Sequence, residues 1–212
     1  MTLRSRVAQD AVHAVVNAVE APDDLLLAVR GCRACATQLP LGPRPLLQAG
    51  GSARILIVGQ APGTRAHASG IPWSDRSGER LREWMGIDAH RFYDRSCVAI
   101  VPMGLCYPGR AASGELPPRR ECAPLWLDRL LAQPPRIQLT LLVGAYAQAH
   151  FLRSAGHASV TATMRDWRTH LPRVVPLPHP SPRNIEELLP VLQRSVRELV
   201  DGQAFGGRPV AI

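Results

Sequence analysis

The chain has 212 residues, of which 46% are hydrophobic and 20% are charged, and its net charge at pH 7 is +8. This composition excludes a fibrous or disordered chain, and the length suits one ordinary domain with a sizeable core, so we expect a single, monomeric domain over residues 1–212. No run is apolar and long enough to span a bilayer, and charged residues interrupt the N-terminus too often for a signal peptide. We therefore expect a cytoplasmic protein without a membrane partner.

The basic residues are all arginines, because the 25 Lys and Arg positions include no lysine. Arginine forms bidentate contacts to phosphate more readily than lysine does. A basic surface of this kind favours a nucleic-acid partner, while an ordinary solvated surface remains the alternative.

The first part of the chain combines a helical pattern with a cysteine-bearing loop. Residues 9–30 have apolar positions at helical spacing, interrupted near Ala21 and Pro22. The segment 31–51 that follows is rich in proline and carries two of the five cysteines. Disulfides are uncommon in reducing compartments, so five cysteines in such a chain indicate thiols or metal ligands.

Four short runs of apolar and β-branched residues follow, and they alternate with helical patterns. This alternation predicts an α/β fold, a three-layer α/β/α sandwich with a central four-stranded parallel sheet. The predicted strands are 55–58, 97–101, 138–143 and 173–177, and the predicted helices are 77–86, 117–132, 145–155 and 184–200. We expect residues 203–212 to be a flexible tail.

Two loops follow the first and the last predicted strands, at the edge of a parallel sheet where ligands bind. The first loop is the sequence GQAPG, in which Gly59 and Gly63 allow close approach to a ligand and Pro62 stiffens the turn. The second is PHPSPRN, in which two prolines flank His179. A histidine held in this way can stabilise negative charge on a leaving group. The alternatives are a plain strand-to-helix turn and an inert loop histidine.

Four of the five cysteines have the spacing of metal ligands. Cys32 and Cys35 form a C-x-x-C pair, and Cys106 and Cys122 follow later in the chain. Four thiolates grouped in this way can enclose a four-iron, four-sulfur cluster or a tetrahedral zinc ion, and buried cysteines without metal are the third possibility. Cys97 lies inside the second apolar run, where we expect it to pack in the core.

The motifs GQAPG, GIPW and HPSPRN together resemble those of the uracil-DNA glycosylase superfamily, in which two site motifs follow the first and last strands of a four-stranded parallel sheet. The cysteine pattern is similar to that of the iron–sulfur-containing, family 4 type. The resemblance covers roughly residues 31–184. It implies a hydrolase that cleaves the N-glycosidic bond of uracil or another deaminated base in DNA, for base-excision repair, with a structural four-iron, four-sulfur cluster.

The resemblance also implies roles for individual residues. His179 would stabilise the departing base, Trp73 would stack on it, and Gln60 with the GQAPG backbone would position base and water. The implied base-binding residues of that loop are Gly59, Ala61, Pro62 and Gly63, and the implied DNA-binding residues are Arg65, Arg76, Ser181, Arg183 and Asn184. Because no lysine is available for a Schiff base, we expect a monofunctional glycosylase.

The sequence departs from the family 4 pattern at two positions. Family 4 has a glutamate where this chain has Gln60, which cannot act as a general base, and Asp75 is the nearest substitute carboxylate. The family also has an asparagine that reads the base, at a position occupied here by Pro102. Backbone groups of Met103 and Gly104 are the expected substitutes, and the preferred base need not be uracil.

Two other classes of function stay open. One is a non-catalytic nucleic-acid-binding or damage-sensing module of the same fold, which Gln60 and Pro102 favour. The other is a metalloprotein unrelated to DNA, which predicts no salt-dependent affinity for DNA.

Overall fold

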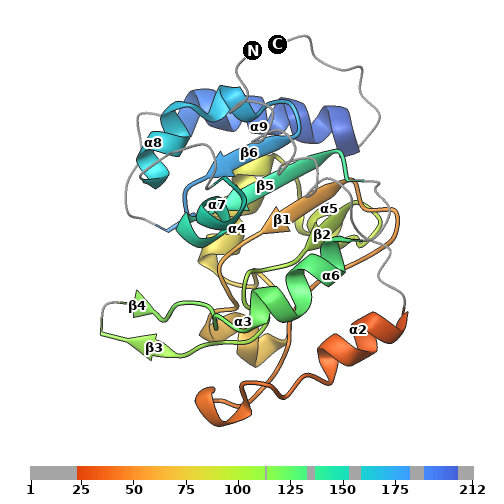
Figure 1. Ribbon diagram of the computed structural model, residues 1–212. Helices are drawn as coiled ribbons and strands as arrows, with labels where there is room; N and C mark the ends of the chain where they lie inside the picture. The colour runs from red at the N-terminus through yellow and green to blue at the C-terminus, as the bar shows by residue number, and fades with distance from the viewer. Residues whose placement is uncertain (1–22, 113, 133–136, 153–158, 182–188, 205–212) are drawn as a thin grey trace, which may run out of the picture.

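The computed structural model describes residues 23–112, 114–132, 137–152, 159–181 and 189–204. Its centre is a four-stranded parallel sheet with the strand order β2-β1-β5-β6 (Figure 1). Every residue of these strands is buried, which is why each strand reads as a continuous apolar run. The strands are β1, Ile55–Val58; β2, Val98–Ile100; β5, Leu139–Val143; and β6, Val174–Leu177.

Helices cover both faces of the sheet, so the predicted three-layer α/β/α fold is confirmed (Figure 1). Alternate residues of β1 point to opposite faces: Leu56 and Val58 pack with α2, α6 and α7, whereas Ile55 and Ile57 pack with α4, α5, α8 and α9. The helices are α2, Asp23–Arg30; α3, Thr64–Ser69; α4, Arg76–Met85; α5, Ala89–Tyr93; α6, Asp128–Leu131; α7, Ala145–Phe151; α8, Val160–Arg165; and α9, Leu189–Ala204. None of the helices in the described ranges is long and apolar enough to cross a bilayer.

The observed elements follow the predicted ones closely, with differences at their ends. The segment 117–132 becomes helical only from Ala123, first as the π-helix η2, Ala123–Leu127, because prolines at 117 and 118 precede it and Pro124 cannot donate a backbone hydrogen bond. The helix α9 continues to Ala204, so the first two residues of the expected flexible tail are helical. Parts of the predicted helices, 9–22, 153–155 and 184–188, and the tail residues 205–212 lie outside the described residues.

A small antiparallel hairpin was not predicted from the sequence. Its strands are β3, Arg110–Ala111, and β4, Gly114–Glu115, and Figure 1 shows the pair extending away from the main sheet. The short helices α3, α5 and α8 and two 3-10 helices, Ala36–Gln38 and Trp167–His170, were also missed. These elements have only two to six residues each, so no periodic apolar pattern marks them.

Candidate functional site

A cavity of about 210 Å³ opens at the carboxyl ends of β1 and β6, where ligands of open parallel sheets bind. Its walls come from the GQAPG loop, from the segment that leads into α4, from the loop after β2, from the end of β4 and from the loop after β6. The side chains and glycines that line it include Gly59, Gln60, Ala61, Pro62, Gly63, Pro72, Trp73, Asp75, Ser77, Pro102, Pro108, Glu115, Leu116 and His179. Hereafter this cavity is called the main pocket.

The GQAPG loop is fastened to the loop after β2 by backbone hydrogen bonds. The N–H of Met103 donates to the carbonyl of Gly59, and the N–H of Gly104 donates to the carbonyl of Gln60, each over 2.9 Å. Position 59 also requires glycine, since a Cβ there would lie 2.8 Å from Cζ2 of Trp73. The glycine therefore lets the indole pack directly on the loop.

Trp73 has a backbone conformation that non-glycine residues rarely adopt, with φ at 57°. Its carbonyl accepts hydrogen bonds from the hydroxyl of Tyr93 at 3.1 Å and from Arg82 at 3.3 Å. A Cβ on Gly78 would lie only 1.8 Å from the same carbonyl, so α4 can approach only because this residue is glycine. Surrounding contacts thus hold a strained residue in place, an arrangement typical of functional sites.

His179 lies beside Trp73 at the open side of the main pocket. The two rings are 5.9 Å apart between centroids and are tilted by 34°. The flanking Pro178 and Pro180 are buried, and the N–H of Ser181 donates to the carbonyl of His179 over 2.7 Å, which fixes the loop. His179 is exposed as a whole residue, but protein on one side of the ring removes water from it and lowers the pKa of His179, while the Asp75 carboxylate opposes that shift. The shift favours the neutral imidazole.

Two carboxylates face the main pocket. Asp75 is the N-cap of α4, where its Oδ1 accepts the N–H of Gly78 over 2.9 Å. Glu115 at the end of β4 is the second. Its side chain is exposed, and the part of it that faces the pocket loses enough water to raise its pKa; Arg110 and the N–H of Thr64 oppose the shift and Asp75 adds to it. A Cβ placed on Gly63 would lie 3.6 Å from Oε1 of Glu115 and 3.9 Å from Oδ2 of Asp75, so both groups face the same part of the loop.

Gln60 connects the GQAPG loop to the hairpin. Its side-chain amide donates a hydrogen bond to the carbonyl of Leu116 over 2.9 Å. Leu116 directly follows Glu115, and its own N–H donates to the carbonyl of Gly109 over 3.0 Å. The amide of Gln60 therefore holds the hairpin against the main pocket.

The structure brings together most of the residues that the sequence singled out, but not all of them. Those that line the main pocket are His179, Gln60, Asp75, Trp73, Gly59, Ala61, Pro62 and Gly63. Arg65 on α3 and Arg76 on α4 are exposed, and Ser181 is half-buried just beyond His179. Arg183 and Asn184 lie outside the described residues.

The expectation that backbone groups of Met103 and Gly104 read the base is narrowed to their carbonyl groups. Their N–H groups already donate to the carbonyls of Gly59 and Gln60, so these donors are not available to a base. The side chain of Met103 is buried in the core, and Gly104 lines the pocket of the cysteines instead of the main pocket.

Glu115 and Ser77 are pocket residues that the sequence did not identify. Gly114, the first residue of β4, has a positive φ of 130° and is the local signal that could have indicated a change of chain direction here. Nothing in the sequence indicates that this hairpin reaches the GQAPG loop, because the contact joins segments about fifty residues apart.

The four cysteines with ligand spacing line one small, mainly apolar pocket, hereafter the cysteine pocket. Cys32 and Cys35 follow α2, Cys106 lies in the loop after β2, and Cys122 immediately precedes η2. The fifth, Cys97, is half-buried on the opposite side of the sheet, packed against the other core cluster.

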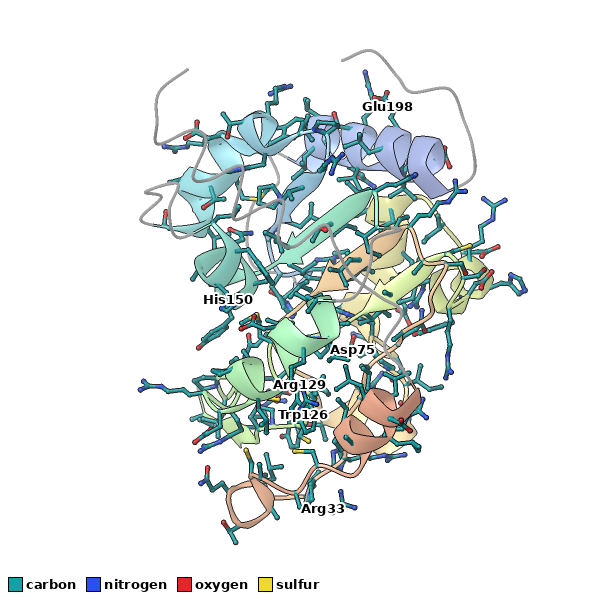
Figure 2. All side chains as sticks on the ribbon, turned by 45° about the vertical axis from the view of Figure 1, so that its right-hand side comes forward. Arg33, Asp75, Trp126, Arg129, His150 and Glu198 are labelled. Atoms are coloured by element: carbon teal, nitrogen blue, oxygen red, sulfur yellow. The ribbon has the colours of Figure 1, made fainter. Side chains whose placement is uncertain are left out.

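Hydrogen-bond donors point at the sulfurs of the cysteine pocket. The N–H of Leu105 donates to Sγ of Cys122, and Nε1 of Trp126 donates to Sγ of Cys32, each over 3.3 Å. Burial raises the pKa of Cys122 to about 11, and the neighbouring cysteines add to the shift. Figure 2 labels Trp126 and Arg129 on adjoining helical turns; the Arg129 guanidinium lies 5.1 Å from the indole ring.

The donor set of the cysteine pocket fits an iron–sulfur cluster. Four thiols within an apolar pocket, with N–H groups aimed at sulfur, are the surroundings that such clusters have in proteins. Within the described part of the chain, no three His, Cys, Asp or Glu side chains meet closely enough to hold one metal ion. A four-iron cluster binds each thiolate through a different iron, so it accepts thiols that are farther apart than the ligands of one zinc ion.

The chain matches a known protein family. The family model described as "Uracil DNA glycosylase superfamily" matches residues 48–199, which is well over half of the chain. The matched range contains the residues that line the main pocket except Leu46, and it contains two of the four cysteines, Cys106 and Cys122; it begins after the C-x-x-C pair.

Proposed function

Because the chain belongs to the uracil-DNA glycosylase superfamily, we propose that it hydrolyses the N-glycosidic bond of uracil or another deaminated base in DNA. The observation that carries this proposal is the main pocket, in which Trp73 and His179 meet at the carboxyl edge of the sheet. Enzymes that act on a base extrude it from the helix into such a pocket.

The size and lining of the main pocket support binding of one flipped base. Its volume of about 210 Å³ is many times what a single water molecule needs. The indole of Trp73 offers a flat face for stacking, and every base has a π-face that can use it. The shape therefore suits a planar ring and leaves its chemical identity open to assay.

His179 would stabilise the departing base. As the bond between C1′ and the base nitrogen breaks, its electron pair moves onto the base. A neutral imidazole can donate a hydrogen bond to the base oxygen on which this charge collects, and its position between two prolines orients the donor in advance. The lowered pKa of His179 supports this assignment, because it keeps the ring neutral at working pH.

DNA would approach the face that carries the main pocket. Arg65 and Arg76 are exposed near the starts of α3 and α4, on either side of the segment that leads to Trp73. With a net charge of +8 and no lysine, contacts to phosphate would come from arginine, and affinity would fall as salt rises.

We also propose that the protein is of the iron–sulfur-containing, family 4 type. Cys32, Cys35, Cys106 and Cys122 would hold a four-iron, four-sulfur cluster, and zinc is the less favoured occupant because no described group of side chains converges on one ion. When bound, the cluster would link the N-terminal loop to the loop after β2, which is a structural role.

The decisive experiment is base release from labelled oligonucleotides that carry uracil, hypoxanthine, xanthine or no damage, in single and double strands. Abasic sites are revealed by strand cleavage in alkali. We expect release of at least one damaged base, and a loss of about 10²-fold or more in His179→Ala, as for removal of a donor to developing negative charge. The matched control is His150→Ala, an exposed histidine on α7 (Figure 2).

Two results would contradict the proposal. If folded wild-type protein releases no base from any substrate but binds DNA, the chain is a binding or damage-sensing module, the alternative that Gln60 and Pro102 favour. If His179→Ala releases base as fast as the wild type, His179 has no part in the chemistry.

A further inference from the structure

We propose that Glu115 is the general base of the main pocket and that Gln60 is the residue that positions it there. This inference rests on the proposed glycosylase function and assigns the carboxylate that the GQAPG loop itself lacks. Glu115 belongs to the hairpin of β3 and β4, a segment to which the sequence motifs give no role.

The geometry places Glu115 where a water molecule would have to be held. Glu115 lines the main pocket together with Trp73 and His179. Its carboxylate lies over the GQAPG loop near Gly63, and the N–H of Thr64 at the start of α3 favours its charged form. One carboxylate accepts several hydrogen bonds, so the group can interact with this N–H and still accept one from water.

Asp75 is the less suitable carboxylate, although it faces the same part of the loop. Its Oδ1 caps α4 through the N–H of Gly78, and a protonated aspartate would weaken that cap. Its charge nevertheless matters to the site, because it raises the pKa of both Glu115 and His179. Asp75 is therefore already engaged as the cap of α4, and Glu115 is the carboxylate suited to receive a proton.

A hydrogen bond from Gln60 fixes the hairpin that carries the general base, Glu115. The amide of Gln60 donates to the carbonyl of Leu116, the residue after Glu115. An ionised glutamate has no hydrogen to donate, so a glutamate at position 60 could not make this contact. It would also place a third negative charge beside Glu115 and Asp75. Gln60 thus holds the hairpin in the position in which Glu115 faces the main pocket.

The proposed step is hydrolysis with one water molecule. The water oxygen forms a bond to C1′ of the deoxyribose while the bond from C1′ to the base nitrogen breaks, and the electron pair of that bond leaves with the base. Glu115 takes the proton that the attacking water loses. His179 donates a hydrogen bond to the base while the charge collects on it. The base anion then takes one proton from solvent, and Glu115 returns its proton to solvent, so that the products are the free base and an abasic sugar.

The charges around Glu115 determine how its protonation affects the rate. Arg110, its partner across the hairpin, favours the carboxylate, as does the N–H of Thr64, whereas Asp75 and the loss of water favour the protonated form. The active form is the carboxylate, so the rate should rise with pH as Glu115 loses its proton, at a pH above the ordinary range of a glutamate.

The main test compares Glu115→Gln with Glu198→Gln, an exposed glutamate on α9 (Figure 2), in single-turnover base release. We expect Glu115→Gln to lose about 10²- to 10⁴-fold in rate, the usual contribution of a general base, with unchanged affinity for damaged DNA. The acidic limb of its pH profile should also lose the inflection that belongs to Glu115. Glu198→Gln should match the wild type. A rate for Glu115→Gln equal to that of the wild type would overturn the inference.

Two further variants separate a catalytic role from a structural one. Glu115→Ala should regain part of its rate when formate is added, since a small carboxylate can occupy the space left by the side chain. Gln60→Glu should be slower than the wild type, because it loses the hydrogen bond to Leu116 and repels Glu115. A faster Gln60→Glu enzyme would show that a carboxylate belongs at position 60 and would overturn the proposal.

The outcomes also distinguish this inference from the proposed function. A wild-type protein that releases base, together with an undiminished Glu115→Gln variant, overturns the role of Glu115 and leaves the glycosylase intact. A wild-type protein that releases no base overturns both.

Discussion

At the scale of single residues, the main pocket contains two groups, His179 and Glu115, whose pKa values are shifted in opposite directions. The pKa of His179 is lowered mainly by loss of water, and the pKa of Glu115 is raised mainly by the same cause. An imidazole and a carboxylate respond oppositely because desolvation disfavours whichever form carries the charge. Such pairs are typical of sites that divide acid and base roles between two residues.

These shifts predict the pH dependence of base release. Because the pKa of His179 is lowered from 6.5, its neutral form persists at neutral and mildly alkaline pH, and the rate should stay level there. As pH falls, both Glu115 and His179 gain protons, and the rate should decrease. The measurement is a single-turnover profile from about pH 5 to about pH 9 for wild type and Glu115→Gln. A rate that falls as pH rises through 6 to 8 would instead make the imidazolium the active form.

At the scale of elements, the first turn of α4 and the loop before it form one packed unit. Asp75 caps the helix, and Gly78 in its first turn packs against the carbonyl of Trp73. The position of Trp73 over the GQAPG loop therefore depends on how closely α4 can approach. A strained tryptophan at the pocket is held by a helix that is itself buried against the sheet.

Substitution of glycine in two helices tests this dependence. Gly78→Ala would place a Cβ 1.8 Å from the carbonyl of Trp73, so we expect a loss of about 1–3 kcal/mol in the free energy of unfolding and a marked loss of base release. The control is Gly202→Ala in α9, where a Cβ meets nothing within 4 Å and removal of a helical glycine should stabilise by about 0.5–1 kcal/mol. Urea unfolding and base release measure both. Equal behaviour of the two variants would show that α4 does not position Trp73.

At the scale of the whole molecule, the two pockets share one connecting loop. The segment after β2 lines the main pocket with Pro102 and Pro108, and it lines the cysteine pocket with Gly104, Leu105 and Cys106. A cluster bound by Cys106 together with the other three thiols would hold this segment in place. The cysteines thus lie where a structural cofactor could stabilise the main pocket.

Iron analysis of cysteine variants tests this arrangement. Anaerobically purified wild-type protein should be brown and contain about four irons per chain. Cys122→Ser should lose iron and unfold at lower temperature, because a ligand is removed from a buried site. Cys97→Ser should keep its iron, since Cys97 lies on the other side of the sheet. Colourless wild-type protein with one zinc per chain would refute the cluster, and iron loss in Cys97→Ser would refute the assignment of ligands.

The four strands of the central sheet and the two loops that follow β1 and β6 could be predicted from the amino-acid sequence. Strands buried on both faces are continuous apolar runs, so β1, β2, β5 and β6 could be located to within one or two residues. Ligands bind beyond the carboxyl ends of such strands, so the loops that carry Gln60 and His179 could be assigned to one site from their places after β1 and β6. Trp73 was assigned to the same site by the family resemblance of its motif.

Which polar groups of that site are free to contact a ligand could be learned only from the folded structure. It showed that the N–H groups of Met103 and Gly104 are already used, that Asp75 caps a helix, and that Glu115 reaches the main pocket. The physical reason is that these facts depend on contacts between loops distant in the chain. A local sequence pattern indicates whether a residue is buried in a strand or helix. The hydrogen-bond partner of a polar group in a loop depends instead on how separate elements pack together.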